Sequence, residues 1–139
     1  MPHDIPKATI KRKVVIIGAG PAGMEAARVS AERGHHVVVF EAAPKPGGQI
    51  RLAAQSPRRR EMMSIIDWRI TQCEARNVEF RFNTLAQAYD ITELEPDVVI
   101  IATGGLPNTQ LFETKKEQSS VVTSWDIISG DVKPAKHML

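Results

Sequence analysis

A glycine-rich hexapeptide between an apolar run and a helix is the feature that most restricts how this chain can fold. Residues 14–17 (VVII) are apolar and β-branched without alternation, which predicts a strand buried on both faces of a parallel sheet. Residues 18–23 (GAGPAG) follow at once, and a helix is predicted over residues 21–33, ended by Gly34. A second apolar run at residues 36–41 (HVVVFE) completes a strand–helix–strand unit with a right-handed crossover. The fold class is therefore α/β.

Each glycine of the hexapeptide has a physical role in such a loop. Gly18 permits the tight turn, Gly20 lets the backbone approach a diphosphate, and Gly23 lets the helix lie close to the sheet. The amides at the helix start and the positive end of the helix dipole favour an anion there. Glu41, which ends the second strand, can accept hydrogen bonds from an adenosine ribose and would repel a 2′-phosphate. The pattern predicts a dinucleotide site and does not choose between FAD and NAD.

The rest of the chain extends the same architecture into a three-layer, Rossmann-like parallel sheet. Ser56 and Pro57 supply a capping hydroxyl and a first-turn proline for a long helix. The run VVII at residues 98–101 predicts another strand buried on both faces. The remaining expected elements are a loop at residues 42–55, the long helix at 56–76, a strand at 78–82, a one-turn helix at 90–93 and a helix at 124–129 ended by Gly130.

Composition narrows the class of protein. The chain has 139 residues, 42% of them hydrophobic and 24% charged, which is ordinary for one globular domain. The formal net charge of +2 gives no reason to expect nucleic acid as a partner, and no apolar run reaches the length of a membrane span or a signal peptide. A cytoplasmic protein is expected. The expected organisation is an exposed lead-in at residues 1–12, a nucleotide-binding domain at 13–130 and a tail at 131–139 that could begin a second nucleotide-binding domain.

Three stretches together resemble a known family. The segments VVIIGAGPAG, FEAAPKPGGQIRLA and DVVIIATGG are similar to the FAD-binding half of flavoproteins with two dinucleotide domains. Within them the chain most resembles the C-terminal part of the old-yellow-enzyme-related flavoproteins, a group with trimethylamine dehydrogenase, 2,4-dienoyl-CoA reductase and the N-methylproline and betaine demethylases. The stretches PGGQIRLAAQSPRRRE, IIDWR and PDVVIIATGGLPNT look most like the demethylases. The resemblance covers residues 10–133.

The resemblance implies a set of FAD contacts. The glycine loop would surround the pyrophosphate, Glu41 would bind the adenosine ribose, and Gly48 and Gln49 would pass along the pyrophosphate and ribityl region. The end of the 98–101 strand would lie beside the cofactor. The full set of implied cofactor-binding residues is Gly18, Ala19, Gly20, Pro21, Ala22, Gly23, Glu41, Ala42, Gly48, Gln49, Leu52, Ala102, Thr103 and Gly104.

The departures from the family pattern are also informative. Relatives of this type carry an N-terminal barrel with FMN, cysteines for an iron–sulfur cluster, and an inserted second nucleotide domain, none of which this chain contains. FMN and the cluster are therefore expected only in a longer parent, and this chain is expected to be a piece that holds FAD or its ADP portion without turning over substrate. The alternatives are an NAD-binding module of a dehydrogenase and a non-catalytic domain that retains ADP or AMP. An uncovered sheet edge or face would favour self-association.

The remaining chemically interesting side chains have plainer explanations. Arg58, Arg59 and Arg60 could meet phosphate or an acidic partner, but a solvated charged turn is the favoured interpretation. Trp68 is expected to pack beside the apolar stripe of the long helix, and Cys73 to be a small buried apolar residue. His35 and His36 have no partners at metal-ligand spacing, and no nucleophile, base and orienting group occur together. We therefore expect neither a metal site nor catalytic residues in this chain.

Overall fold

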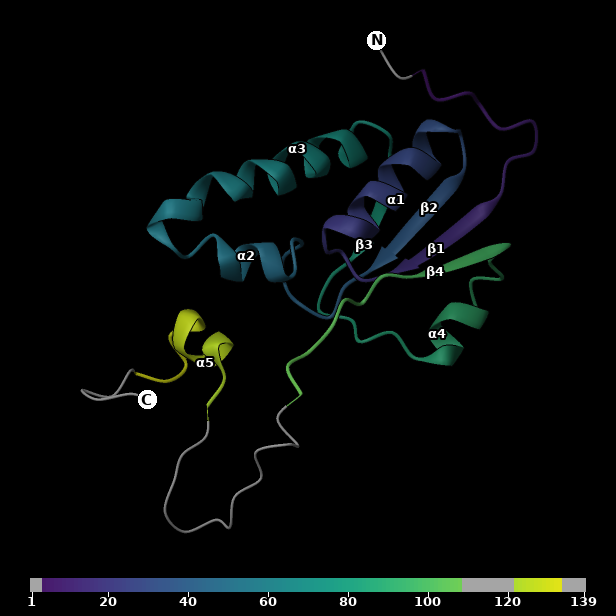
Figure 1. Cartoon of the computed structure of the whole chain (residues 1–139). Helices are drawn as coiled ribbons and strands as arrows, with labels where there is room; N and C mark the ends of the chain where they lie inside the picture. Colours follow the sequence, from purple (N-terminus) through teal and green to yellow (C-terminus); the bar gives the residue numbers. More distant parts are fainter. Residues whose placement is uncertain (1–3, 109–121, 134–139) are drawn as a thin grey trace.

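A parallel sheet forms the centre of the computed structural model, which describes residues 4–108 and 122–133. The four-stranded sheet has the order β3-β2-β1-β4 (Figure 1). Every pairing in it is parallel. The strands are β1 (Lys13–Ile17), β2 (His36–Phe40), β3 (Glu79–Arg81) and β4 (Val98–Ile101). The expected α/β fold with a parallel sheet is confirmed.

Helices cover the two faces of the sheet unequally. On one face, α1 (Pro21–Glu32) and α3 (Met63–Glu74) pack over a core that includes Val14, Ile16 and Val39. On the other face the short α4 (Ala88–Thr92) is the only helix that packs within the described part of the chain, and a smaller core there includes Phe40 (Figure 1). The other helices are α2 (Gln49–Ala53), the 3-10 helix η1 (Pro57–Met62) and α5 (Ser124–Ser129).

The register of the sheet determines where a ligand site can form. Ile17 pairs with Phe40 of β2 and with Ile101 of β4, so these three strands end together. Loops that follow parallel strands meet at the carboxyl edge of a sheet, where α/β domains bind ligands. The segments after residues 17, 40 and 101 are the ones singled out from the sequence, and the sheet brings them to one edge.

The long helix expected at residues 56–76 is divided in the structure. Its first part is η1, in which Arg59 N–H donates to the Ser56 carbonyl at 2.9 Å, and α3 begins only at Met63. Pro57 occupies the first turn as predicted, but the Ser56 hydroxyl makes no capping hydrogen bond, so that detail of the prediction was wrong. The tight turn uses the Ser56 carbonyl instead. The expected loop at 42–55 also contains a helix, α2, which the prediction missed.

The fully buried third strand was a wrong prediction for β4. Its side chains are largely exposed, with Val99 at 43% and Ile101 at 74%. β4 lies at the edge of the described sheet and pairs with β1 alone. Side chains alternate between the two faces along a strand, so Val99 and Ile101 lie on the face that carries α4. On that face Ile91 of α4 packs against β1 and β2 and does not cover β4. The apolar run thus predicted the strand correctly, but the elements packed beside the strand determine how exposed it is.

Two short helices illustrate how caps determine helix ends. α5 spans the predicted residues, with Thr123 and Asp126 forming a capping box and Gly130 ending the helix at φ +85°. α4 begins at Ala88, earlier than predicted, because Asp90 accepts a hydrogen bond from Gln87 N–H at 2.8 Å and thus lies at the third helical position. The predicted tail at 131–139 lies outside the described residues after Lys133.

A network of charges joins α1 to α3. Glu25 forms ion pairs with Arg28 at 2.7 Å and with Arg69 at 3.0 Å, and Glu32 pairs with Arg76 at 3.2 Å. Hydrogen bonding to Arg28, the largest cause, lowers the pKa of Glu25 although partial burial opposes it. Trp68, which was predicted to pack beside the apolar stripe, is half exposed, with the Arg28 and Arg69 guanidinium groups over its ring. No helix among the described residues is both long and apolar enough to cross a bilayer.

Candidate dinucleotide-binding site

Two glycines of the loop are required by close contacts between backbone segments. Gly18 has φ +103°, and a Cβ added to it would lie 2.5 Å from the Ala102 carbonyl oxygen. A Cβ on Gly23 would lie only 1.9 Å from the Gly18 carbonyl oxygen. Real Cβ atoms do not approach backbone this closely, so the turn, the start of α1 and the end of β4 fit together only without these side chains. Both roles predicted for Gly18 and Gly23 match this packing.

Gly20 differs from Gly18 and Gly23 because, among the described residues, nothing lies where its side chain would be. A Cβ added there would meet no atom within 4 Å, and its φ of −70° is accessible to any residue. Neither backbone strain nor internal packing therefore requires glycine at this position. What glycine provides is bare backbone facing open space at the N-terminus of α1, the place where a helix dipole favours an anionic group.

Glu41 lies under the loop and is bonded to it. Its Oε2 accepts a hydrogen bond from Ala19 N–H at 2.7 Å, and its Oε1 accepts one from Ala43 N–H at 2.8 Å. Ala19 is fully buried, whereas Glu41 is partly exposed. Each carboxylate oxygen has further lone pairs. The carboxylate can thus hold the loop and still accept hydrogen bonds from a ligand. Its bonds to the backbone were not foreseen from the sequence.

The double-glycine segment closes over the loop. Gly47 N–H donates to the Ala19 carbonyl at 2.8 Å, and a Cβ on Gly48 would lie 3.3 Å from Gly20 Cα. Both glycines have positive φ, at +123° and +49°. The Gln49 side chain then reaches the end of β4, where its Nε2 donates to the Gly105 carbonyl at 2.7 Å. The segments after β1, β2 and β4 are thereby joined by hydrogen bonds.

The predicted cofactor-binding residues do not all lie equally near the glycine loop and Glu41. Ala102 N–H donates to the Ile17 carbonyl at 2.8 Å and so continues the β1–β4 ladder up to the loop, and Thr103 and Gly104 follow it in exposed positions. Ala42 is exposed beside Glu41. Leu52 instead lines a separate hollow of about 200 Å³, between α2 and α5, with Trp125. Trp125 was missed by the sequence analysis, because no pattern signals that α5 packs on α2.

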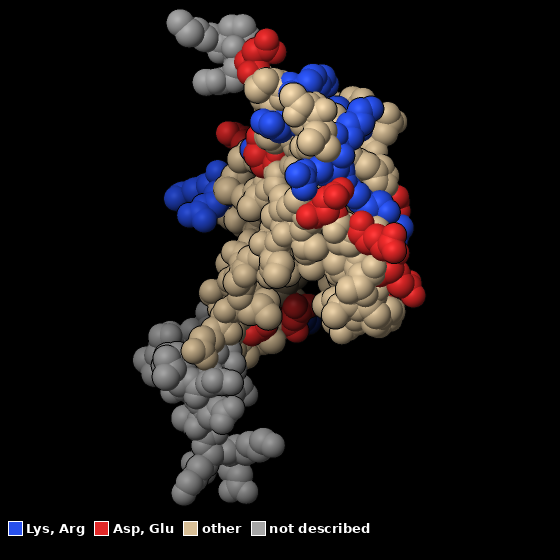
Figure 2. Space-filling view, turned by 90° about the vertical axis from the view of Figure 1, so that its right-hand side faces the viewer, with Lys and Arg blue, Asp and Glu red and all other residues tan. Residues whose placement is uncertain are grey.

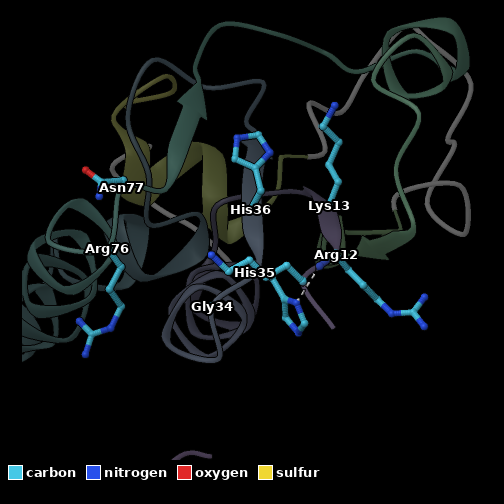
Figure 3. Close-up of a pocket in the computed structure, with 8 residues that line it drawn as sticks. Arg12, Lys13, Gly34, His35, His36, Arg76 and Asn77 are labelled. Atoms are coloured by element: carbon cyan, nitrogen blue, oxygen red, sulfur yellow. Dashed lines mark hydrogen bonds between the residues drawn. The ribbon is translucent and has the colours of Figure 1, made fainter. Parts of the chain in front are cut away.

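A larger pocket, of about 460 Å³, lies at the opposite end of the sheet. It is lined by residues 11–13 and 34–36 with Arg76 and Asn77. Figure 2 faces this end of the molecule, where lysine and arginine side chains gather above a group of acidic ones. The basic side chains do not converge, since Lys13 and His36 point to one side and Arg76 to the other (Figure 3). Lys13 Nζ already donates to the Leu94 carbonyl at 2.6 Å. The pocket offers no arrangement comparable to the glycine loop.

Cys73 is fully buried, as expected, and its environment makes it unreactive. Burial raises the pKa of the thiol to about 11, against an ordinary value of 9.0. At pH 8 we expect the folded chain to react with iodoacetamide about 100-fold more slowly than the urea-unfolded chain, because the thiolate is that much scarcer. The raised pKa also means that this group's contribution to stability is complete below pH 9 and is lost as the pH rises through 11. Equal alkylation rates would contradict the burial of Cys73.

The comparisons with known proteins agree with this geometry. Residues 12–137 match the pyridine nucleotide-disulphide oxidoreductase family. The chain is 63% identical, over its whole length, to a probable N-methylproline demethylase from Rhizobium meliloti, and covers 20% of that protein. It is 46% identical to an N,N-dimethylglycine/sarcosine dehydrogenase from Chromohalobacter salexigens, covering 100% of this chain and 21% of the relative. The chain thus spans about a fifth of the length of these relatives.

Solved structures show the same relationship. The chain superposes on a 2-naphthoyl-CoA reductase, in complex with 2-naphthoyl-CoA, with a TM-score of 0.81 and 37% identity, covering 93% of this chain and 19% of the other. Histamine dehydrogenase from Rhizobium sp. 4-9 gives a TM-score of 0.70 and 33% identity over 74% of this chain and 16% of the other. The chain belongs to the pyridine nucleotide-disulphide oxidoreductase family, as an FAD-binding domain of flavin oxidoreductases.

Proposed function

We propose that this chain holds the ADP portion of FAD on the surface built by the glycine loop, Glu41, the 47–49 segment and residues 102–104. The pyrophosphate would lie against the bare backbone at Gly20 and the first amides of α1. The adenosine ribose would lie at Glu41. Bound FAD supplies the electron-accepting group, and the residues of this chain supply binding and orientation. The wider contact set is the one implied by the resemblance, including Pro21, Ala22, Ala42 and Leu52.

The observation that carries the proposal is the contrast among the loop glycines. Gly18 and Gly23 are explained by packing, but Gly20 has open space where its side chain would be. The residues at this edge also fit the group chemically, since helix-start amides suit a diphosphate and a carboxylate suits a ribose with free hydroxyls.

Absorbance spectroscopy tests the proposal directly. The purified chain is mixed with FAD, excess cofactor is removed by gel filtration, and the visible spectrum is recorded. A retained flavin band supports a surface that is sufficient for the whole cofactor. A colourless protein that still binds ADP in a calorimetric titration would limit the site to the adenosine half. Binding of NAD with an affinity above that for FAD would favour the NAD-binding alternative, and a chain that binds none of these nucleotides would contradict the proposal.

For the longer protein we propose flavin-dependent oxidation of an N-methylated amine or betaine. The support is the 63% identity to a probable N-methylproline demethylase and the 46% identity to an N,N-dimethylglycine/sarcosine dehydrogenase. In that protein an iron–sulfur cluster would belong to other domains, because this chain has one cysteine, and it is buried. The resemblance places FMN in another domain as well. Assays of N-methylproline and dimethylglycine oxidation by the full-length protein test this assignment, and activity only on enoyl substrates would favour the reductase relatives.

We further propose that the exposed edge formed by β4 supports self-association of this chain in isolation. β4 pairs with β1 alone in the described sheet, and its Val98, Val99 and Ile101 are exposed by 38%, 43% and 74%. Unpaired strand edges and exposed apolar patches of this kind associate readily with other chains. We expect the sedimentation coefficient to rise with concentration, and an Ile101→Lys variant to stay monomeric. Sedimentation as a monomer at all concentrations would contradict this proposal.

A further inference from the structure

We propose that Glu41 is a positioning residue whose carboxylate holds the glycine loop in its binding shape before any nucleotide arrives. The inference concerns the surface that is proposed above to bind FAD. It rests on that proposed function only in the part of its test that measures ADP binding. The role differs from contact with a ribose, because it uses two backbone N–H groups of the chain itself and predicts an effect in the absence of ligand.

Through its two hydrogen bonds, Glu41 connects the glycine loop to the segment after β2, and the bond to Ala19 spans 22 residues of sequence. Oε2 of Glu41 accepts from Ala19 N–H at 2.7 Å, and Oε1 accepts from Ala43 N–H at 2.8 Å. Each oxygen therefore serves a different segment, one in the glycine loop and one just after β2. Hydrogen bonds to an ionised acceptor are short and stronger than neutral ones. One side chain thus connects the loop to the end of the neighbouring strand.

Ala19 depends on this carboxylate because it is fully buried. Its carbonyl accepts from Gly47 N–H at 2.8 Å, and the preceding Gly18 N–H donates to the Phe40 carbonyl at 2.7 Å. With these neighbours held, the Ala19 N–H points at Glu41. A buried N–H that loses its acceptor is costly, so removal of the carboxylate should make the loop turn or open locally.

Neither glutamine nor aspartate, the side chains most similar to glutamate, can make both hydrogen bonds. In Glu41→Gln one of the two acceptors becomes an NH2 group, which faces a backbone N–H donor instead of accepting from it. Glu41→Asp keeps both oxygens but is one methylene shorter. An aspartate readily accepts from the N–H two residues on, here that of Ala43, but it is too short to reach Ala19 at the same time.

Amide hydrogen exchange, followed by NMR on the nucleotide-free chain, tests the positioning role. In Glu41→Asp we expect Ala19 N–H to exchange about 10–100-fold faster than in the wild type, while Ala43 keeps its protection. In Glu41→Gln we expect one or both of these amides to exchange faster by a similar factor, with the amides of β1 unchanged. Glu61→Gln is the matched control, since Glu61 is exposed and its side chain has no hydrogen bond or ion pair within the described part of the chain.

Two results would overturn the proposal. One is unchanged exchange at Ala19 in both Glu41 variants. The other is equal acceleration of Ala19 and the β1 amides, which would mean that Glu41 contributes to overall stability and not to the loop. If Glu41→Gln fails to fold, Glu41→Asp decides between these outcomes through its contrast of Ala19 with Ala43.

A calorimetric titration with ADP separates this inference from the proposed function. We expect both Glu41 variants to bind ADP at least 10-fold more weakly than the wild type, and Glu61→Gln to bind it equally well. Wild-type chain that fails to bind ADP contradicts the proposed function, while the exchange data still support or overturn the positioning role. Faster Ala19 exchange in the variants with unchanged ADP affinity would support positioning of the loop and place the nucleotide elsewhere.

Discussion

A Gly23→Ala variant is expected to be destabilised by about 3 kcal/mol or more, with a fall in Tm of roughly 10 °C. Two effects compete at this position. Alanine favours the helix over glycine by about 1 kcal/mol. Its Cβ, however, would lie 1.9 Å from the Gly18 carbonyl oxygen, and that contact is with backbone which is itself packed against Ala102. The steric term should dominate, because neither the loop nor the end of β4 can move without breaking the other.

Thermal and urea unfolding followed by circular dichroism measure this change. Gly105→Ala is the matched control, since an added Cβ there meets nothing within 4 Å and the residue has no positive φ. We expect the control to change the free energy of unfolding by less than about 0.5 kcal/mol. A Gly23→Ala variant as stable as the wild type would mean that α1 does not approach the loop as closely as described.

The second large effect is expected at Gly20, on binding and not on stability. Gly20→Ala should fold with a stability within about 1 kcal/mol of the wild type, because its φ of −70° suits alanine and its Cβ would meet open space. The same Cβ would occupy the surface on which the pyrophosphate is proposed to lie. We expect the affinity for ADP to fall at least 10-fold, or about 1.4 kcal/mol.

Calorimetric titration of ADP into folded Gly20→Ala provides the measurement, and unfolding curves show whether the fold is intact. Glu61→Gln again serves as the control, with unchanged affinity for ADP expected. Wild-type affinity in Gly20→Ala would show that no ligand group approaches this backbone. Loss of stability in Gly20→Ala similar to that of Gly23→Ala would contradict the open space around residue 20.

Several elements could be predicted because their causes are local. The apolar runs of β1 and β2 follow from β-branched residues, and the ends of α1 and α5 follow from Pro21, Gly34 and Gly130, which have the backbone conformations that such ends require. The start of α4 was misplaced because the role of Asp90 depends on which N–H it accepts from. The division of the long helix into η1 and α3 could not be predicted either, because the spacing of apolar residues is similar in the two types of helix.

The candidate site shows the same limit. The separate roles of Gly18, Gly20 and Gly23 could be predicted from the sequence, but the hydrogen bonds that Glu41 accepts from the backbone could not. The contact of Gln49 with Gly105 joins residues that are far apart in sequence, so no local pattern contains it. Trp68 was predicted to pack beside the apolar stripe of the long helix, but no sequence pattern indicated the two arginines that flank its ring.

The amino-acid sequence by itself determined that this chain forms a parallel α/β domain with a glycine loop between β1 and α1, since periodicity and turn chemistry act between near neighbours. Only the tertiary structure decided which surfaces are covered and which groups meet. The exposure of β4 depends on its place at the end of the described sheet, where α4 packs on β1 and β2 instead. The hydrogen bonds from Ala19 and Ala43 to Glu41 and the open space at Gly20 depend on segments that come together at the carboxyl edge of the sheet. Contacts of that kind are set by three-dimensional packing, which sequence spacing does not encode.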